Sequence, residues 1–286
     1  MKRVMPTLRR VRAAAEAVTD GASMWDPLTV GINEYGEVVR IRLPEHHVLV
    51  AGEPGSGKSV ALQMLVAKAA LDPGVELVLL DGKRVELAPW SGCASRSVWW
   101  NVDDAISAVG ELQAECERRL EVICSAPGIK RKVERGDGLG LVLVVIDELA
   151  LYCTAPRPAG PEFSARLRLL VQLCRATGII VAAATQKPSH DVIPTSLRDL
   201  FGFRWALRCA TREASDTILG SGWASRGYSA ADIDAAGRGV GYLLHECGLP
   251  VRMRACYLSD DDLARLVARA EVRRAHPAPG LKVVGG

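Results

Sequence analysis

Short apolar runs alternate with longer amphipathic stretches along most of this chain. Runs such as 47–52 (HVLVAG) and 141–147 (LVLVVID) consist mainly of branched apolar residues, which is typical of buried strands. The stretches between them repeat apolar residues at helical spacing. Strands that alternate with helices of roughly 10–20 residues predict an α/β fold with a mostly parallel sheet and helices on both faces.

The pattern also predicts where each element lies. The predicted strands cover residues 47–52, 75–81, 141–147, 178–185, 204–209, 240–245 and 251–258. The predicted helices cover residues 58–71, 102–124, 161–177 and 260–274. Residues 1–45 do not follow this alternation. We therefore predict a basic N-terminal segment and lead-in over 1–45, one α/β domain over 46–275, and a flexible tail over 276–286.

Composition narrows the class of protein. Of the 286 residues 49% are hydrophobic and 24% are charged, as in ordinary soluble domains. The longest apolar run, 139–146, is too short to cross a bilayer, and the basic N-terminus lacks the apolar core of a secretory signal. These features predict a cytoplasmic protein. The eight cysteines form no C-x-x-C pair, so we expect reduced thiols in the core.

A phosphate-binding motif lies directly after the first predicted strand. The run GEPGSGKS at 52–59 fits G-x-x-x-x-G-K-[ST], and it opens a predicted helix. Glycines let backbone N–H groups turn toward phosphates, Lys58 would reach the β- and γ-phosphates, and the Ser59 hydroxyl would bind Mg²⁺. A glycine turn with a surface lysine is the alternative. The predicted ATP-binding residues are Gly52, Glu53, Pro54, Gly55, Ser56, Gly57, Lys58, Ser59 and Val60.

Polar side chains follow two further predicted strands. Asp147 and Glu148 directly follow the apolar run LVLVVI at 141–146. There Asp147 would hold Mg²⁺, and Glu148 would orient or deprotonate the attacking water. Both acids could instead cap the following helix. Gln186 follows the strand at 178–185 and is expected to sense the γ-phosphate, although a lone glutamine there also fits an ordinary loop.

These blocks together resemble the motor domain of FtsK/SpoIIIE-type DNA translocases. The resemblance runs in order through VLVAGEPGSGKS, LLDGKRVELAPW, LVLVVIDELA, CRATGIIVAAATQKPSHDVIPTSL, FRWALRCATREASDTIL and YLSDDDLARLV, from about residue 47 to residue 267. Size and the basic N-terminus look most like transfer proteins of actinobacterial conjugative elements. The resemblance implies a RecA-like P-loop ATPase that assembles as a hexameric ring and moves double-stranded DNA, in conjugative or intermycelial transfer or in chromosome partition.

The resemblance also implies roles for single residues. Lys58 and Ser59 match Walker A, Asp147 and Glu148 match Walker B, and Gln186 matches the sensor. Residues 187–200 align with the loop that faces the DNA channel. Arg204 is the first candidate for an arginine finger into the neighbouring subunit and Arg175 the second, although either arginine also fits an ordinary surface position.

The chain departs from the family pattern at several points. Gly82 stands where the family's D-P-K block has proline, and Asp216 replaces an arginine, which puts the role of each position in doubt. We also expect no transmembrane anchor and no winged-helix extension after residue 267. Attachment at the membrane, if required, would then need the basic N-terminus or a membrane-associated partner.

The overall net charge of +3 argues neither for nor against a polyanionic partner such as DNA, so the distribution of charge along the chain matters more. The segment 157–212 contains nine basic residues and three acidic ones, and a second basic cluster spans 130–135. Such clusters, repeated around a ring, would contact DNA phosphates without reading bases. Solvated arginines are the alternative explanation. Two other functions stay open: an FtsK-like ATPase that energises protein secretion, and a small-molecule kinase, which would leave the acidic pair and the later blocks unexplained.

Overall fold

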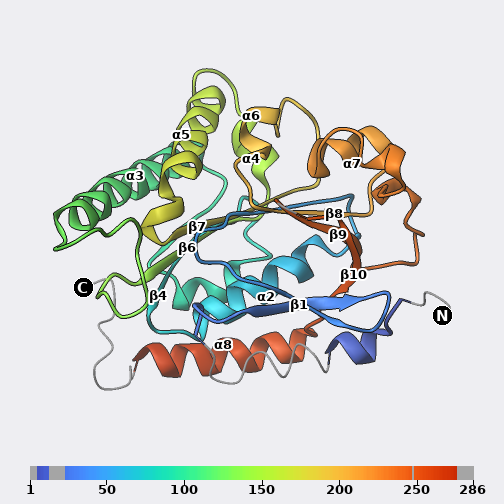
Figure 1. Ribbon diagram of the computed structural model, residues 1–286, viewed down its shortest axis with the longest axis horizontal. Coiled ribbons are helices and arrows are strands. Elements are labelled where there is room, and N and C mark those ends of the chain that lie inside the picture. Colours follow the sequence, from blue (N-terminus) through green and yellow to red (C-terminus); the bar gives the residue numbers. More distant parts are fainter. Residues whose placement is uncertain (1–4, 13–22, 247, 276–286) are drawn as a thin grey trace.

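A single ten-stranded sheet forms the centre of the molecule (Figure 1). The structure, a computed structural model, describes residues 5–12, 23–246 and 248–275. The strand order is β2-β1-β10-β9-β8-β3-β7-β6-β4-β5. The strands are β1 (Leu28–Asn33), β2 (Val38–Ile41), β3 (Val48–Ala51), β4 (Val75–Leu80), β5 (Arg96–Val98), β6 (Leu141–Ile146), β7 (Ile179–Thr185), β8 (Phe203–Leu207), β9 (Val240–His245) and β10 (Val251–Ala255).

Helices cover both faces of this sheet, as the sequence predicts. In Figure 1, α2 (Lys58–Ala70) and α8 (Asp260–Ala275) lie on one face, whereas α3 (Val102–Ser125), α4 (Leu149–Cys153), α5 (Ala159–Leu173), α6 (Thr195–Arg198) and α7 (Arg212–Leu219) lie on the other. Short 3-10 turns complete the set: η1 (Ala88–Cys93), η2 (Cys174–Thr177), η3 (Ala224–Arg226) and η4 (Ala230–Asp232). Each face of the sheet has its own hydrophobic core.

Strand β3 shows why its apolar run is continuous. Val48 and Val50 belong to the core beneath α2, and Leu49 and Ala51 belong to the core on the opposite face. Successive side chains of a strand point to opposite faces, so a strand covered on both sides needs apolar residues at every position. Burial of each such Val or Leu contributes roughly 1.5–3 kcal/mol. The run therefore fixes β3 at the centre of the sheet.

The sheet has a parallel part and an antiparallel part. Strands β5, β4, β6, β7, β3 and β8 run parallel, which confirms the predicted α/β class. Strands β9, β10, β1 and β2 continue the sheet in antiparallel fashion. Strands β1 and β2 fall within the predicted lead-in, yet they belong to the same sheet. The division of the chain at residues 45 and 275 stays a prediction.

Several expectations concern the exterior and the termini. Six of the described cysteines are buried free thiols, as expected, but Cys124 is exposed, because it lies on the solvent side of α3. No helix in 5–12, 23–246 or 248–275 is both long and apolar enough to span a bilayer. The predicted tail 276–286, together with Lys2, Arg3 and Cys247, lies outside the described residues.

Candidate nucleotide-binding site

One edge of the sheet gathers the residues predicted to bind and cleave a nucleotide. The phosphate-binding loop follows β3, Asp147 and Glu148 follow β6, and Gln186 follows β7. Because β3, β6 and β7 are parallel, their carboxyl ends meet at the same edge. The structure thus brings together segments that lie far apart in the sequence: Lys58 and Asp147, for example, are 89 positions apart.

The loop between β3 and α2 is anchored at its start by two backbone hydrogen bonds. The Gly52 N–H donates to the Thr185 carbonyl (3.3 Å), and the Glu53 N–H donates to the Arg208 carbonyl (2.9 Å). The Glu53 carboxylate also pairs with the Arg208 guanidinium at 2.6 Å. Gly57 caps α2 with a φ of 106° and no side-chain cap. The first N–H groups of α2 therefore remain directed at the space before the helix, where an anion is favoured.

Lys58 contacts Asp147 in the interior of the site. Its ammonium donates to Asp147 Oδ1 at 2.9 Å and to the Asp147 carbonyl at 2.8 Å. Lys58 is 4% exposed and Asp147 is fully buried, so the pair is held in one geometry. Asp147 Oδ2 is also buried and has no hydrogen-bond partner within the described residues. An unpaired carboxylate oxygen beside the helix N-terminus suits a metal ion or its bound water.

Glu148 is oriented by the end of β7. Its carboxylate accepts a hydrogen bond from Thr185 Oγ1 at 2.7 Å, and both of its oxygens lie near the Gln186 N–H, at 3.1 and 3.2 Å. The Lys83 ammonium lies 3.9 Å from Glu148 Oε2. Although Glu148 stands at the N-cap position of α4, its side chain makes no capping bond. The helix-capping alternative is therefore wrong for Glu148, and the Lys58 contact accounts for Asp147.

The loop after β4 explains one departure from the family pattern. Asp81 is fully buried, and its carboxylate accepts hydrogen bonds from the N–H groups of Lys83, Leu87 and Ala88. A Cβ at Gly82 would collide with the side chain of Leu151 on α4. Glycine rather than proline thus fits here because Leu151 fills the adjacent space. This loop places Lys83 beside Glu148 without a proline.

Asp216, the second departure, has a local structural role. Its carboxylate accepts hydrogen bonds from the N–H groups of Gly222 (2.9 Å) and Ala224 (2.8 Å), so it holds the turn that follows α7. An arginine cannot accept these bonds.

A pocket of about 460 Å³ opens in front of the loop. Its volume lies in the range of small-molecule sites. Glu53, Lys58 and Ser59 line one side of it, and Gln186 lines another. The sequence patterns did not indicate the residues that complete the wall: Leu8, Glu86, Arg238, Gly239, Ala255 and Tyr257. They come from four separate segments and share no motif, so only the tertiary fold brings them to this pocket.

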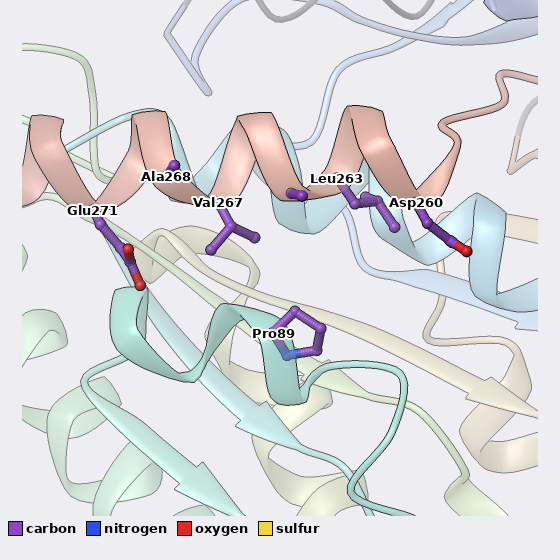
Figure 2. A pocket seen from close by; sticks show the side chains of 7 residues that line it. Pro89, Asp260, Leu263, Val267, Ala268 and Glu271 are labelled. Carbon is purple, nitrogen blue, oxygen red and sulfur yellow. The ribbon is translucent and has the colours of Figure 1, made fainter.

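A second depression of similar size, about 440 Å³, lies between α8 and η1. Figure 2 shows Leu263 and Val267 on α8 above Pro89, with Asp260 and Glu271 toward its two ends. It contains none of the phosphate-loop residues or carboxylates described above. It does not take part in the candidate chemistry.

The two candidate finger arginines lie at the opposite edge of the sheet. Arg204 is the second residue of β8, and Arg175 lies in η2 just before β7. Arg204 is 14% exposed and lies 3.4 Å from Asp199, and burial lowers its pKa. Arg175 is 44% exposed and pairs with Glu246 at 2.9 Å. Neither arginine lines the pocket beside this chain's own phosphate-binding loop.

Most cations of the segment 157–212 have an acidic partner. Arg166 pairs with Glu162, Lys187 with Asp191, and Arg212 with Asp232, in addition to the pairs of Arg175, Arg198, Arg204 and Arg208. These ion pairs are mostly exposed and weak, so they can be exchanged for phosphates at little cost. The excess of positive charge in the segment 157–212 is therefore largely neutralised by ion pairs within the described residues.

Comparison with known proteins assigns the family. Residues 8–236 match the FtsK/SpoIIIE family along four fifths of the chain. The chain belongs to the FtsK/SpoIIIE family. Among curated proteins, DNA translocase FtsK of Staphylococcus aureus (strain Mu50) is 31% identical over 260 residues, which cover 85% of this chain and 30% of that protein. DNA translocase FtsK of Chlorobaculum tepidum is 33% identical over 218 residues, covering 69% and 26%.

Solved structures share the FtsK/SpoIIIE-type fold. The pCW3 conjugation coupling protein TcpA superposes with a TM-score of 0.73 at 23% identity, covering 94% of this chain and 74% of that one. The cytoplasmic domain of the type VII secretion ATPase EccC from Thermomonospora curvata gives 0.68 at 20% identity, covering 94% and 34%. At these identities the similarity establishes a P-loop ATPase fold. The chain spans about a third of the length of the curated FtsK relatives.

Proposed function

We propose that this chain is an ATP-driven motor domain that moves double-stranded DNA. One observation carries the proposal: three parallel strands place Lys58, Asp147 and Glu148 at one sheet edge. There they adjoin a pocket large enough for a nucleotide. Membership of the FtsK/SpoIIIE family supports ATP as the nucleotide and DNA as the substrate.

The loop and α2 would bind the triphosphate. Backbone N–H groups at the start of α2 provide donors and the positive end of the helix dipole, and Lys58 would exchange its contact with Asp147 for the β- and γ-phosphates. The hydroxyl of Ser59 and the unpaired Oδ2 of Asp147 would hold Mg²⁺. A bound magnesium ion would neutralise charge that develops on the phosphates.

Glu148 would act on the attacking water. The Glu148 carboxylate accepts hydrogen bonds from the Thr185 hydroxyl and the Gln186 N–H, so the side chain is positioned before a nucleotide binds. A preoriented carboxylate can accept a proton from water or align the water for attack on the γ-phosphate. Gln186 lines the pocket and its N–H contacts Glu148, which supports a sensor that links the γ-phosphate to the base.

Assembly and location are part of the proposal. A homo-oligomeric ring, hexameric in the family resemblance, would bring an arginine of one subunit to the pocket of the next. The loop 187–200 and the basic residues of 157–212 would contact DNA phosphates by exchanging their present partners. The DNA moved would be that of a conjugative element or a chromosome. A membrane-associated partner would hold the motor at the membrane.

ATP turnover of the full chain tests the proposal directly. We expect hydrolysis to rise with the length of added linear duplex DNA and to lose that stimulation steeply as salt increases. Lys58→Ala should abolish turnover, and Glu148→Gln should bind ATP but hydrolyse it at least about 100-fold more slowly. Glu121→Gln, on the exposed side of α3, is the matched control and should behave like the wild type.

The same assay separates the competing functions. Stimulation by secreted peptides rather than duplex DNA would support the secretion ATPase and overturn DNA translocation. Phosphate transfer to a small acceptor would support the kinase. Unchanged turnover in Lys58→Ala would overturn the nucleotide site itself.

A further inference from the structure

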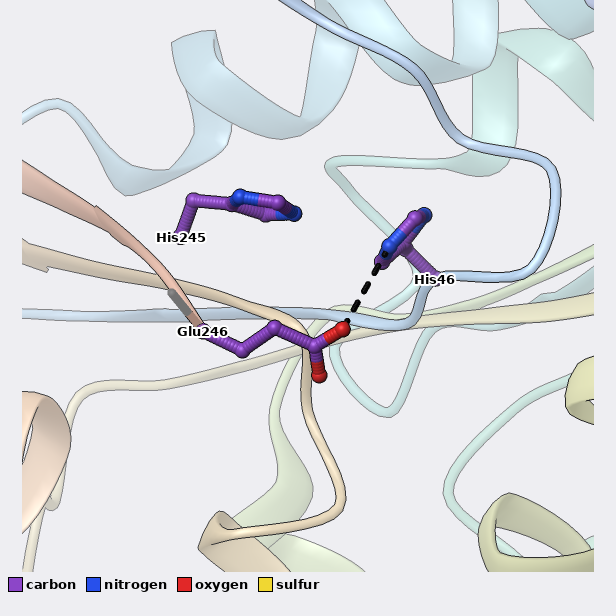
Figure 3. A group of neighbouring side chains, drawn as sticks. All are labelled: His46, His245 and Glu246. Carbon is purple, nitrogen blue, oxygen red and sulfur yellow. Dashed lines mark ion pairs between the residues drawn. The ribbon is translucent and has the colours of Figure 1, made fainter. Parts of the chain in front are cut away.

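Two histidines and a glutamate meet at the sheet edge opposite the phosphate-binding loop. His46 precedes β3, His245 ends β9, and Glu246 follows it. Strand β8 brings them together, because Phe203 pairs with Val48 on one side and with His245 on the other. One ligand atom from each of the three residues lies within 4.8 Å of the others. Figure 3 shows the Glu246 carboxylate directed at His46, with the His245 ring opposite.

The protonation of His46 is set by its backbone contact. Its Nδ1 lies 3.1 Å from the Pro44 carbonyl. A carbonyl only accepts hydrogen bonds, so Nδ1 carries the proton and the neutral ring has its lone pair on Nε2. That Nε2 lies 3.6 Å from Glu246 Oε1 (Figure 3). A metal cation placed between these two atoms could accept the lone pair of Nε2 and contact Oε1 at the same time.

The other two side chains are also positioned by their surroundings. Arg175 contacts both carboxylate oxygens of Glu246, at 2.9 and 3.3 Å, and the Glu246 N–H donates to the Gly202 carbonyl at 2.9 Å. The His245 ring stacks on Phe203 with centroids 4.7 Å apart. These contacts limit the rotamers of both residues and place them around His46.

Glycine at position 202 makes room for the first histidine. A Cβ on Gly202 would lie 2.8 Å from His46 Cδ2 and 3.4 Å from its Cγ. The ring therefore occupies space that any other residue at 202 would fill. The cluster is thus a fitted arrangement with outer contacts of the kind that support metal ligands: a backbone carbonyl at the far nitrogen of a histidine and an arginine that hydrogen-bonds the carboxylate.

We propose that His46 Nε2, His245 and Glu246 Oε1 bind one divalent transition-metal ion of the zinc class. Two imidazoles and one carboxylate are a donor set that zinc and cobalt accept, whereas magnesium and calcium prefer oxygen alone. Zinc–ligand distances of about 2.0–2.2 Å require the three side chains to move closer together. His46 and Glu246 are 21% and 34% exposed, so they have the freedom to do so and solvent completes the coordination.

This metal site is separate from the nucleotide site. It lies at the amino ends of β3 and β8, whereas the phosphate-binding loop and Asp147 lie at the carboxyl ends of the parallel strands. Metal binding without nucleotide therefore does not depend on the proposed ATPase activity. The two proposals stand or fall by different experiments.

Cobalt titration of the untagged full chain, without nucleotide, tests the proposal. We expect one equivalent of Co²⁺ to bind, with visible d–d absorption typical of nitrogen and oxygen ligands, and Zn²⁺ to displace it. His46→Gln, His245→Gln and Glu246→Gln should each weaken binding by at least about tenfold. His190→Gln, which changes an exposed histidine outside the cluster, is the matched control and should bind like the wild type.

The outcome is decided by which substitutions matter. Loss of the stoichiometric band in all three variants, with an intact far-UV spectrum and thermal transition, supports the site. Binding that survives Glu246→Gln or His245→Gln, or that disappears in His190→Gln, would overturn it. Absence of saturable Co²⁺ and Zn²⁺ binding to the wild type would also overturn it.

Discussion

The adjacent histidines His46 and His47 differ in solvent exposure. His46 stays at the surface cluster, whereas His47 is 1% exposed, and its Nδ1 accepts a hydrogen bond from the Val181 N–H at 3.0 Å. Burial, with a smaller contribution from the nearby Arg175 guanidinium, lowers the pKa of His47 from 6.5 to about 4. The sequence HH gives no sign of this difference, because it depends on which distant residues pack against each ring.

The buried histidine predicts how stability depends on pH. In the unfolded chain His47 takes up a proton below its ordinary pKa of about 6.5. In the folded protein it does so only below about pH 4. The stabilisation is therefore fully present above pH 6.5 and is lost as pH falls to about 4. At about 1.4 kcal/mol per pH unit this amounts to about 3 kcal/mol.

Urea unfolding measured from pH 7 to pH 4.5, with EDTA present, tests this. We expect His47→Gln to lose less of its free energy of unfolding over this interval than the wild type, and His190→Gln to lose as much as the wild type. Equal slopes for the wild type and His47→Gln would show that His47 is not the group responsible.

At the scale of elements, the phosphate-binding loop is held in place by the start of β9 as well as by its own motif. The Gly239 N–H donates to the Ser56 carbonyl at 2.8 Å, and a Cβ on Gly57 would lie 2.9 Å from the Gly239 backbone. The motif requires glycine at 57 for a φ of 106°. The fold adds a second requirement, which is the close approach of another loop.

Two glycine variants separate backbone strain from this contact. Gly55 also has a positive φ, 75°, but a Cβ there has no neighbour within 4 Å. Gly55→Ala should lower the free energy of unfolding by roughly 1–2 kcal/mol, the cost of a left-handed alanine. Gly57→Ala should lower it further, because β9's lead-in must also move. Thermal unfolding of both variants measures the difference, and an equal loss in the two would mean that the Gly239 contact does not constrain the loop.

At the scale of the whole molecule, nucleotide groups and candidate finger arginines lie at opposite edges of one sheet. Lys58 and Asp147 stand at the carboxyl ends of the strands, whereas Arg175 and Arg204 stand at the amino ends. No rearrangement within one sheet brings the two edges together. If Arg175 or Arg204 takes part in catalysis, it would therefore have to act on the pocket of a neighbouring copy.

Mixed assemblies test this arrangement. Arg204→Ala and Glu148→Gln should each be inactive alone, but mixing them should restore part of the DNA-stimulated ATP turnover, since some interfaces then combine Arg204 with an intact Glu148. Arg175→Ala mixed with Glu148→Gln is the parallel experiment. If only the Arg175 mixture recovers activity, the finger is Arg175 and the first candidate is wrong.

Much of the fold followed from local pattern. The runs at 141–147 and 178–185 became β6 and β7 within one residue at each end, because strands buried on both faces are continuously apolar. Strand β5 and the pairing of β1 and β2 were missed, since β5 has three residues and β2 is half exposed. Short or partly exposed strands carry little pattern, and the neighbours they pair with are distant in the sequence.

The sequence by itself determined the phosphate-binding loop, the acidic pair and the parallel centre of the sheet, because each depends on residues adjacent in the chain. Tertiary structure alone decided that Thr185 orients Glu148, that Arg238 and Tyr257 complete the pocket, and that His46 meets His245 and Glu246. These contacts join residues from separate strands. Their geometry depends on strand order and register, which the burial of both faces of the whole sheet selects.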